Sequence, residues 1–350
     1  MADQQTVAKV LPPPVAELAG DRPGAGGGWA RVAVVFARGG VTAAGLLLVA
    51  SVLVFALVRA APGDAVDVEF GESGASALLT PEEEAAARAR RAEELGLNRS
   101  VPEQYVRWLD RVVRLDLGTS YRTGRPVADE LVERLPASAA LGGAGFLVAL
   151  AGAWGVGLLS ARRPGGLADH LLRLLSLAAT AVPTFLLGSL ALRYAADWFG
   201  YPVAGEATWR RLWLPAVVLG VGAMPLLARL LRASLISEHG QPYALAAMAR
   251  GASPARVTFR HVMRPAFTPL LTLAGLTLSS LVAGTVITEV IFSWPGVSGY
   301  AVAAIAAKDY PVVQAYLLLV VVVVVLVNRA VDVLQHALDP RVEQRAEATE

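Results

Sequence analysis

The chain has 350 residues, of which 55% are hydrophobic and 17% are charged, with a formal net charge of +2. A soluble domain carries about a quarter charged residues, and here the apolar excess lies in blocks, so the composition excludes one ordinary soluble domain and favours membrane spans. The small net charge offers no basic face for nucleic acid, and the absence of cysteine excludes disulfides, thiol catalysis, iron–sulfur clusters and cysteine zinc sites.

The N-terminal residues 1–38 precede the first apolar stretch and predict a flexible cytoplasmic tail, with proline and glycine runs at Pro12–Pro14 and Gly24–Gly28. Within it, Trp29–Arg38 is typical of a short interfacial helix. A cleaved signal peptide has an apolar region of about 7–15 residues near its start. The first apolar stretch is longer and lies farther in, so we interpret it as a retained span.

Six stretches are apolar and long enough to cross the hydrocarbon layer of a bilayer, which takes about 20 helical residues. They are Gly40–Leu57, Ala137–Ser160, Leu171–Ala195, Leu212–Leu231, Ala266–Phe292 and Val312–Leu334. The last is rich in valine and leucine, but a lone strand in lipid leaves its backbone unpaired, so a helix is expected. The sequence therefore predicts an all-α membrane protein with about six transmembrane helices, in a domain of residues 39–338.

Arginine and lysine in the short loops predict the orientation, because cytoplasmic loops carry more of them. The loop between the second and third spans and the loop of residues 232–265 are basic (Arg162, Arg163, Arg232, Arg250, Arg256, Arg260 and Arg264). The short loops on the other side hold fewer basic residues (Arg210, Arg211 and Lys308). Both termini, including a tail of residues 339–350, are therefore expected in the cytoplasm, with segment 59–136 outside.

The external segment of residues 59–136 is expected to be partly helical. Thr80-Pro81-Glu82-Glu83 combines a cap, a proline and a glutamate three residues after the cap, which predicts a helix start. That helix is expected to run to Leu95 and to end at Gly96. A second amphipathic stretch, Glu103–Leu115, places three side chains on one face (Tyr105, Leu109 and Val112). A structural cap on the membrane domain and a docking surface for an external partner both remain open.

The cytoplasmic loop of residues 232–265 carries the most specific pattern. Tyr243–Arg250 is rich in alanine and predicts a short helix that ends at Gly251. Ser253-Pro254 then predicts the start of a second helix, whose basic residues precede the fifth span (Arg256, Arg260, His261 and Arg264). Small Ala246 and Ala247 are expected to let another surface approach closely. By pattern alone, a docking unit and a basic linker remain equally open.

Few polar residues lie within the predicted spans. Near the span ends, Glu289, Arg329 and Asp332 are interpreted as interfacial rather than as a proton relay, because long side chains reach the interface there. The second span carries small residues at four-residue spacing, which predicts close helix packing (Gly145, Ala149, Ala153 and Gly157). In the third span, Pro183 predicts a kink.

Catalytic motifs are missing from the sequence. Lys9 and Lys308 lie outside any G-x-x-x-x-G-K-[ST] loop, so the chain has no phosphate-binding loop of that kind. The 4 histidines form no H-E-x-x-H, and there is no G-x-S-x-G. We therefore expect a chain that is not an enzyme, to which any energy from ATP must come through another chain.

Several stretches together resemble a known family. They are Val54-Phe55 with Arg59–Asp64, Leu95-Gly96-Leu97 with Gln104-Tyr105 and Trp108-Leu109, Asp116–Tyr121 with Pro126-Val127, Ile291–Gly296, and Asp309–Gln314. These stretches resemble the inner-membrane permease subunits of ABC importers in the oligopeptide, dipeptide and nickel branch, of the first-permease type. The resemblance extends from about Val54 to Leu338 and implies a type I ABC importer-like fold.

The loop of residues 232–265 resembles the coupling loop of that family, the EAA-type motif. The resemblance implies that the loop inserts into a groove on an ATPase subunit and transmits its closure to the spans. The residues that it assigns to this role are Tyr243, Ala246, Ala247, Arg250, Gly251, Ser253, Arg256, His261 and Arg264. The sequence departs from the motif at three places: Leu245 replaces glutamate, Gln241-Pro242 replaces a common acidic residue, and Pro265 replaces asparagine.

The resemblance also implies partners: a second homologous permease, two ATP-binding cassette subunits and an extracytoplasmic binding protein, all acting at the lipid bilayer of the cell membrane. ATP and magnesium would be held by the ATPases, so no cofactor is expected in this chain. Di- or oligopeptides are the expected substrate, with nickel, a sugar or an opine-like solute as open alternatives.

Outside the family, a stand-alone channel or secondary transporter and a membrane enzyme are the competing hypotheses. A secondary transporter needs ion-coupling residues within the membrane, which the spans largely lack. The missing catalytic motifs disfavour a membrane enzyme.

Overall fold

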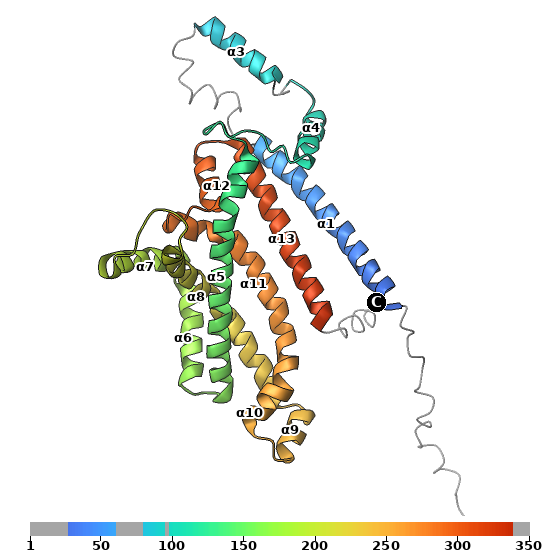
Figure 1. Cartoon of the computed structure of the whole chain (residues 1–350), viewed down its shortest axis with the longest axis vertical. Helices are drawn as coiled ribbons and strands as arrows, with labels where there is room; N and C mark the ends of the chain where they lie inside the picture. Colours follow the sequence, from blue (N-terminus) through green and yellow to red (C-terminus); the bar gives the residue numbers. More distant parts are fainter. Residues whose placement is uncertain (1–26, 61–79, 95–97, 339–350) are drawn as a thin grey trace, which may run out of the picture. The chain divides into compact units, whose positions relative to one another are not determined.

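The structure is a computed structural model that describes residues 27–60, 80–94 and 98–338 (Figure 1). The chain forms two compact units, Met1–Leu46 and Leu47–Glu350, and helix α1 (Gly27–Arg59) crosses their boundary. The unit boundary therefore lies within the first predicted span, and the division of the chain into tails and a membrane domain stays a prediction. Most of the predicted N-terminal tail, the whole predicted C-terminal tail and the predicted helix end at Gly96 lie outside the described residues.

The described part of the second unit is helical, with no strand and one isolated bridge between Thr119 and Pro126. After α1, its elements are α3 (Pro81–Glu94), α4 (Val101–Val113), α5 (Val127–Arg162), α6 (Leu167–Ala181), α7 (Thr184–Phe199), α8 (Trp209–His239), α9 (Pro242–Ala249), α10 (Pro254–Val257), a π-helical turn (Thr258–Val262), α11 (Met263–Ile291), α12 (Val297–Ala306) and α13 (Tyr310–Leu338). The all-α prediction is confirmed for these residues.

Five of the described helices are long and apolar enough to cross a membrane, and α6 with α7 makes up to six if the pair is one span. The five are Gly40–Arg59, Val127–Arg162, Trp209–His239, Pro254–Val282 and Tyr310–Leu334. They cover the first, second, fourth, fifth and sixth predicted spans. The prediction of about six membrane helices is confirmed by their length and composition.

The third predicted span is not one helix but two. Between α6 and α7, Val182 is extended (φ −100°, ψ 118°) and Pro183 follows it, and the two helices meet at a bend of 103°. Proline disfavours a helical conformation in the residue before it and has no N–H to continue the helix. The kink that Pro183 predicted is therefore a complete break.

Helices α5, α8 and α11 lie side by side in the centre of the second unit (Figure 1). The predicted small face of α5 is buried in this contact. A Cβ added to Gly145 would lie 2.7 Å from Leu219 Cδ2, and one added to Gly157 would lie 3.0 Å from the Ala228 carbonyl oxygen. A side chain at Gly145 would press on Leu219 and one at Gly157 on the backbone of α8, so glycine at these positions favours the close approach of α5 and α8.

The described part of the external segment has the predicted helices. The backbone N–H of Thr80 donates to Glu83 Oε2 at 2.9 Å, and the Glu83 N–H donates to Thr80 Oγ1 at 3.4 Å, so the predicted capping box starts α3. Helix α4 packs on the C-terminal end of α1, where Phe55 contacts the rings of Tyr105 and Trp108 at centroid distances of 5.5 and 5.6 Å. Trp108 is buried and is the main anchor of this face of α4. The amphipathic pattern had assigned the face to Tyr105, Leu109 and Val112.

Two of the stretches that carry the resemblance, far apart in the sequence, meet in the structure. The buried carboxylate of Asp309 accepts hydrogen bonds from Ser120 Oγ at 2.5 Å and from the Tyr121 N–H at 3.2 Å. Gly118 has φ +82°, and an added Cβ there would contact Pro311 Cβ at 3.6 Å. These contacts hold the turn before α5 against the turn before α13, which gives a physical reason for both motifs.

We had expected Glu289 to be interfacial, but its side chain is buried near the end of α11, with an exposure of 1%. Its carboxylate accepts from Ser138 Oγ at 2.7 Å and from the Gly299 N–H at 2.8 Å. A carboxylate at a helix N-terminus satisfies N–H groups that have no partner within the helix. Glu289 thus caps α12, a short helix that the sequence analysis left within an external loop. Asp332 is exposed and Arg329 is half-buried, and the two form an ion pair at 3.5 Å, as an interfacial position allows.

Arg211 was counted as a loop residue, but its side chain is buried at 2% exposure. Its guanidinium donates to backbone carbonyls of the α7–α8 connection and of the end of α11 (Pro202, Val203, Gly205, Glu206, Phe292 and Ser293). Five fixed N–H donors suit arginine to this task. Arg211 therefore ties the α7–α8 connection to the end of α11.

Candidate functional site

The predicted helix–glycine–helix unit is present between α8 and α11. Helix α9 runs from Pro242 to Ala249, within one residue of the predicted bounds. Gly251 follows with φ +85°, a left-handed conformation that glycine adopts without strain. Ser253 caps the next helix and accepts a hydrogen bond from the Arg256 N–H at 3.4 Å. These features confirm the local structure that the sequence predicted.

Helix α9 has one buried face and one exposed face. Ala244 and Ala247, three positions apart and so on one side of a helix, are 0% and 3% exposed. The other face carries exposed Tyr243, Leu245 and Met248, at 41%, 52% and 37% exposure. Exposed Ala246 and Ala249 lie on it as well. The expectation that both Ala246 and Ala247 meet another surface is therefore wrong for Ala247, which packs against its own chain.

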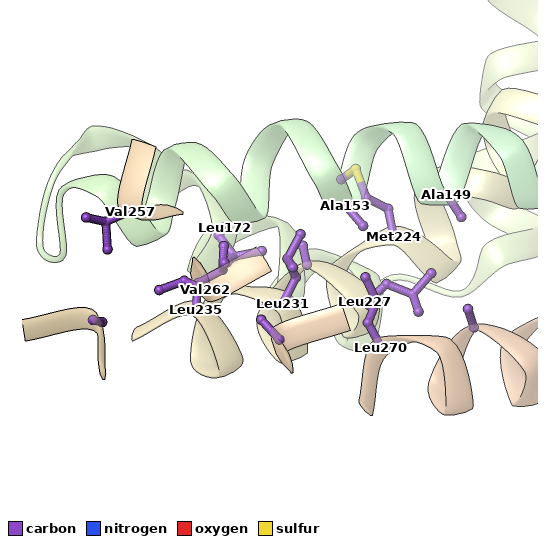
Figure 2. Close-up of a cluster of buried hydrophobic side chains, with 14 of the residues drawn as sticks. Ala149, Ala153, Leu172, Met224, Leu227, Leu231, Leu235, Val257, Val262 and Leu270 are labelled. Carbon is purple, nitrogen blue, oxygen red and sulfur yellow. The ribbon is translucent and has the colours of Figure 1, made fainter. Parts of the chain in front are cut away.

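Helix α9 belongs to a hydrophobic cluster that reaches into the membrane helices (Figure 2). Figure 2 shows Val257 and Val262, which follow α9 in the chain, in the same cluster as Leu172 of α6 and Leu235 of α8. The buried members come from α5, α6, α8, α9 and the start of α11 with its preceding turns (Ala149, Ala153, Leu172, Met224, Leu227, Ala228, Leu231, Leu235, Ala244, Ala247, Val257, Val262, Ala266, Leu270 and Ala274). Close packing transmits displacement, so movement of α9 is expected to reach four other helices.

A polar contact joins the two sides of the loop. The ring nitrogens of His239, at the end of α8, lie 2.7 Å from the Leu235 carbonyl oxygen and 2.9 Å from Thr258 Oγ1. Thr258 begins the π-helical turn between α10 and α11. Such turns interrupt regular helices and are frequent at functional sites. His261, which was predicted as a site residue, is half-buried in that turn. His239 was not predicted, because a histidine at a helix end gives no sign of its partner.

An ion pair between a buried carboxylate and a partly exposed arginine holds α8 to the start of α6 and to the connection before it. The Asp169 carboxylate lies 2.8 Å from Arg232 Nε and accepts from Ser160 Oγ at 3.0 Å and from the Gly165 N–H at 2.9 Å. Arg232 had served only to indicate orientation. The structure gives it a partner 63 residues earlier in the chain, which no local pattern reveals.

The remaining predicted site residues lie on the exposed side of the unit. Arg250, Arg256 and Arg264 are exposed. The Tyr243 hydroxyl donates a hydrogen bond to Glu238. Burial, together with this hydrogen bond, raises the pKa of the Tyr243 phenol to about 12. The phenol therefore keeps its proton near neutral pH and remains a donor.

The arrangement suits a mechanical task rather than a chemical one. Within the described residues, no group of three or more histidine, aspartate or glutamate side chains is placed to hold a metal ion. What the unit offers is an exposed apolar helix that is anchored in the packed core behind it.

Comparison with known proteins decides the family. The family described as "Binding-protein-dependent transport system inner membrane component" matches residues 153–344, and its N-terminal companion, "Binding-prot-dependent transport system membrane comp, N-term", matches residues 34–142. The chain belongs to this family. It is therefore an inner-membrane component of a binding-protein-dependent transport system.

Curated relatives of this permease match over most of their length. A di/tripeptide transport system permease protein of Pseudomonas aeruginosa is 34% identical, with 84% of this chain and 94% of the relative covered. An oligopeptide transport system permease protein of Bacillus subtilis is 33% identical, covering 85% and 95%. A glutathione transport system permease protein of Pectobacterium atrosepticum is 31% identical, also covering 85% and 95%.

Among solved structures, the permease resembles a chain of the MetNI methionine ABC transporter in an inward-facing conformation. The TM-score is 0.50 at 21% identity, and the match covers 60% of this chain and 96% of the other. At that identity the likeness supports the fold, in agreement with the type I ABC importer-like fold that the sequence resemblance implied.

Proposed function

We propose that the permease is a transmembrane subunit of an ATP-driven peptide importer and that α9 docks on an ATPase partner. The observation that carries this proposal is the double character of α9. Its inner face packs through Ala244 and Ala247 into the core of the membrane helices, and its outer face is exposed and apolar. A force that an ATPase exerts on the outer face of α9 is therefore transmitted to α5, α6, α8 and α11 together.

The proposed complex contains a second homologous permease, two ATPase subunits and an extracytoplasmic binding protein. ATP and magnesium are held by the ATPases, whose closure moves α9. The packed core behind α9 has discrete arrangements rather than a continuous range, because close-packed interiors do not deform smoothly. The membrane helices accordingly open to one side or to the other, and substrate crosses by alternating access.

Di- or oligopeptides are the proposed substrates. The names of the relatives support this proposal, since they are permeases for di- and tripeptides, oligopeptides and glutathione. The binding protein selects the solute and delivers it from outside. In the proposed orientation both termini and α9 lie in the cytoplasm, as the basic residues around α9 favour.

The test is uptake by the reconstituted complex. The genes for the permease and its neighbouring transport subunits are expressed together, the complex is purified through a tag on the permease, and the subunits are identified by mass spectrometry. The proposal expects a second permease, an ATPase and ATP-dependent uptake of labelled dipeptide into proteoliposomes. A homo-oligomer without ATPase contradicts it, and uptake of nickel or a sugar in place of peptide contradicts its substrate.

A further inference from the structure

The outer face of α9 specifies the chemistry of the surface that it meets, given the proposed docking on an ATPase. Each of the 8 residues of α9 is uncharged, and Tyr243, Leu245 and Met248 are exposed. Helix α9 also lies outside the helices long enough to span a membrane. A contiguous exposed apolar surface in such a place marks an interaction site.

Positive charge follows this apolar face in the chain. Arg250 ends α9, and three further exposed arginines follow it (Arg256, Arg260 and Arg264). The sequence between His239 and Thr288 holds no aspartate or glutamate. Ion pairs of the described residues lie elsewhere, for example at Arg99–Glu103, Arg125–Glu133 and Arg232–Asp169, and none of them includes these four arginines.

We infer that the ATPase groove receiving α9 has an uncharged, apolar floor facing Leu245 and Met248 and an acidic rim facing Arg250 and Arg256. Leu245 stands where coupling loops of the EAA type carry glutamate, so a basic floor suited to that carboxylate would be buried here without a partner. Burying an unpaired charge is strongly unfavourable. Apolar contact at the centre with complementary charge at the rim is the arrangement of a specific interface.

Substitution of Leu245 tests the floor through the binding of ATPase to the permease. The variants Leu245→Met, Leu245→Glu and Leu245→Lys are compared by the ATPase concentration that half-saturates the detergent-purified permease. Methionine is expected to bind within about twofold of the wild type. Glutamate and lysine are both expected to weaken binding at least tenfold, or about 1.4 kcal/mol. The matched control is Leu167→Glu, which changes an exposed leucine at the start of α6 and is expected to bind normally.

Whether Leu245→Glu weakens ATPase binding decides between an apolar and a basic floor. If Leu245→Glu binds as tightly as the wild type or more tightly, and only the lysine variant is weak, the floor is basic and the inference is wrong. Amide hydrogen exchange of each variant without ATPase verifies that α9 keeps its own fold, so that a weak variant reports the interface.

Charge reversal tests the rim. Arg250→Glu and Arg256→Glu are expected to weaken ATPase binding at least tenfold at low salt, with a smaller difference at 1 M salt, where the Debye length is about 3 Å. Arg162→Glu, on another basic connection, is the control and is expected to bind normally. Unchanged ATPase binding by both arginine variants, with loss of binding to vesicles of anionic lipid, would assign the arginines to lipid and overturn the rim. Failure of the wild type itself to bind ATPase would instead refute the proposed function.

Discussion

Ala246 and Ala247 offer a matched pair that separates the two faces of α9. The same substitution, alanine to leucine, is placed on neighbouring residues, one exposed and the other 3% exposed within the cluster that links α9 to the membrane helices. Adding three carbons to a packed core costs about 1–3 kcal/mol. The buried substitution is therefore expected to increase the population of detached α9 by about 5- to 150-fold, whereas the exposed one leaves it unchanged.

The assay is limited trypsin digestion of the purified permease without ATPase, because Arg250 and Arg256 flank Gly251 and are exposed. Cleavage of a transiently opened segment follows the population of the open form, so Ala247→Leu should be cut faster and Ala246→Leu at the wild-type rate. In the complex the exposed position becomes the sensitive one. Ala246→Leu should weaken ATPase binding, because the larger side chain lies directly at the proposed interface with the ATPase. Equal cleavage of the two variants would refute the assignment of the faces.

Three further substitutions test the supports of the site. Gly251→Pro should abolish uptake while the protein still inserts, because proline fixes φ near −65° and cannot adopt +85°; Gly251→Asn, which tolerates positive φ, should retain most uptake, and equal loss in both would exclude backbone conformation as the cause. Asp169→Ala should lower the Tm in detergent, because Arg232 loses its carboxylate partner. Adding Arg232→Leu should restore part of the lost Tm, and a further fall of the Tm in the double variant would contradict that reason. Gly296→Ala should destabilise the protein by about 1–3 kcal/mol, because its Cβ would collide with the buried carboxylate of Glu289; denaturant unfolding identical to the wild type would show that the carboxylate moves freely.

The structural features that were predicted well from the sequence are those that depend on neighbouring residues. The apolar lengths of the spans, the capping box at Thr80, the glycine turn at Gly251 and the serine cap at Ser253 each depend on a few adjacent positions. The small face of α5 was predicted for the same reason, because its four-residue spacing is local. These patterns, together with the family resemblance, located the candidate site.

The features that sequence missed depend on which residue lies opposite another in space. The helical pattern of α9 contained too few polar residues to show which side is buried, so Ala247 was placed on the wrong face. Arg211 and Arg232 counted as loop charges, although one binds carbonyls of two segments and the other binds Asp169. Glu289 was taken as interfacial because its hydroxyl partner, Ser138, lies 151 residues away in the chain.

The most direct test of the account is site-specific cross-linking from α9. The chain has no cysteine, so Ala246→Cys introduces a single thiol that carries a maleimide photo-cross-linker within the assembled complex. The account predicts a covalent product between the permease and the ATPase, and no such product from Thr123→Cys, an exposed position on the segment proposed to lie outside. An ATPase adduct from position 123, or none from position 246 in a complex that contains ATPase, would contradict the docking of α9.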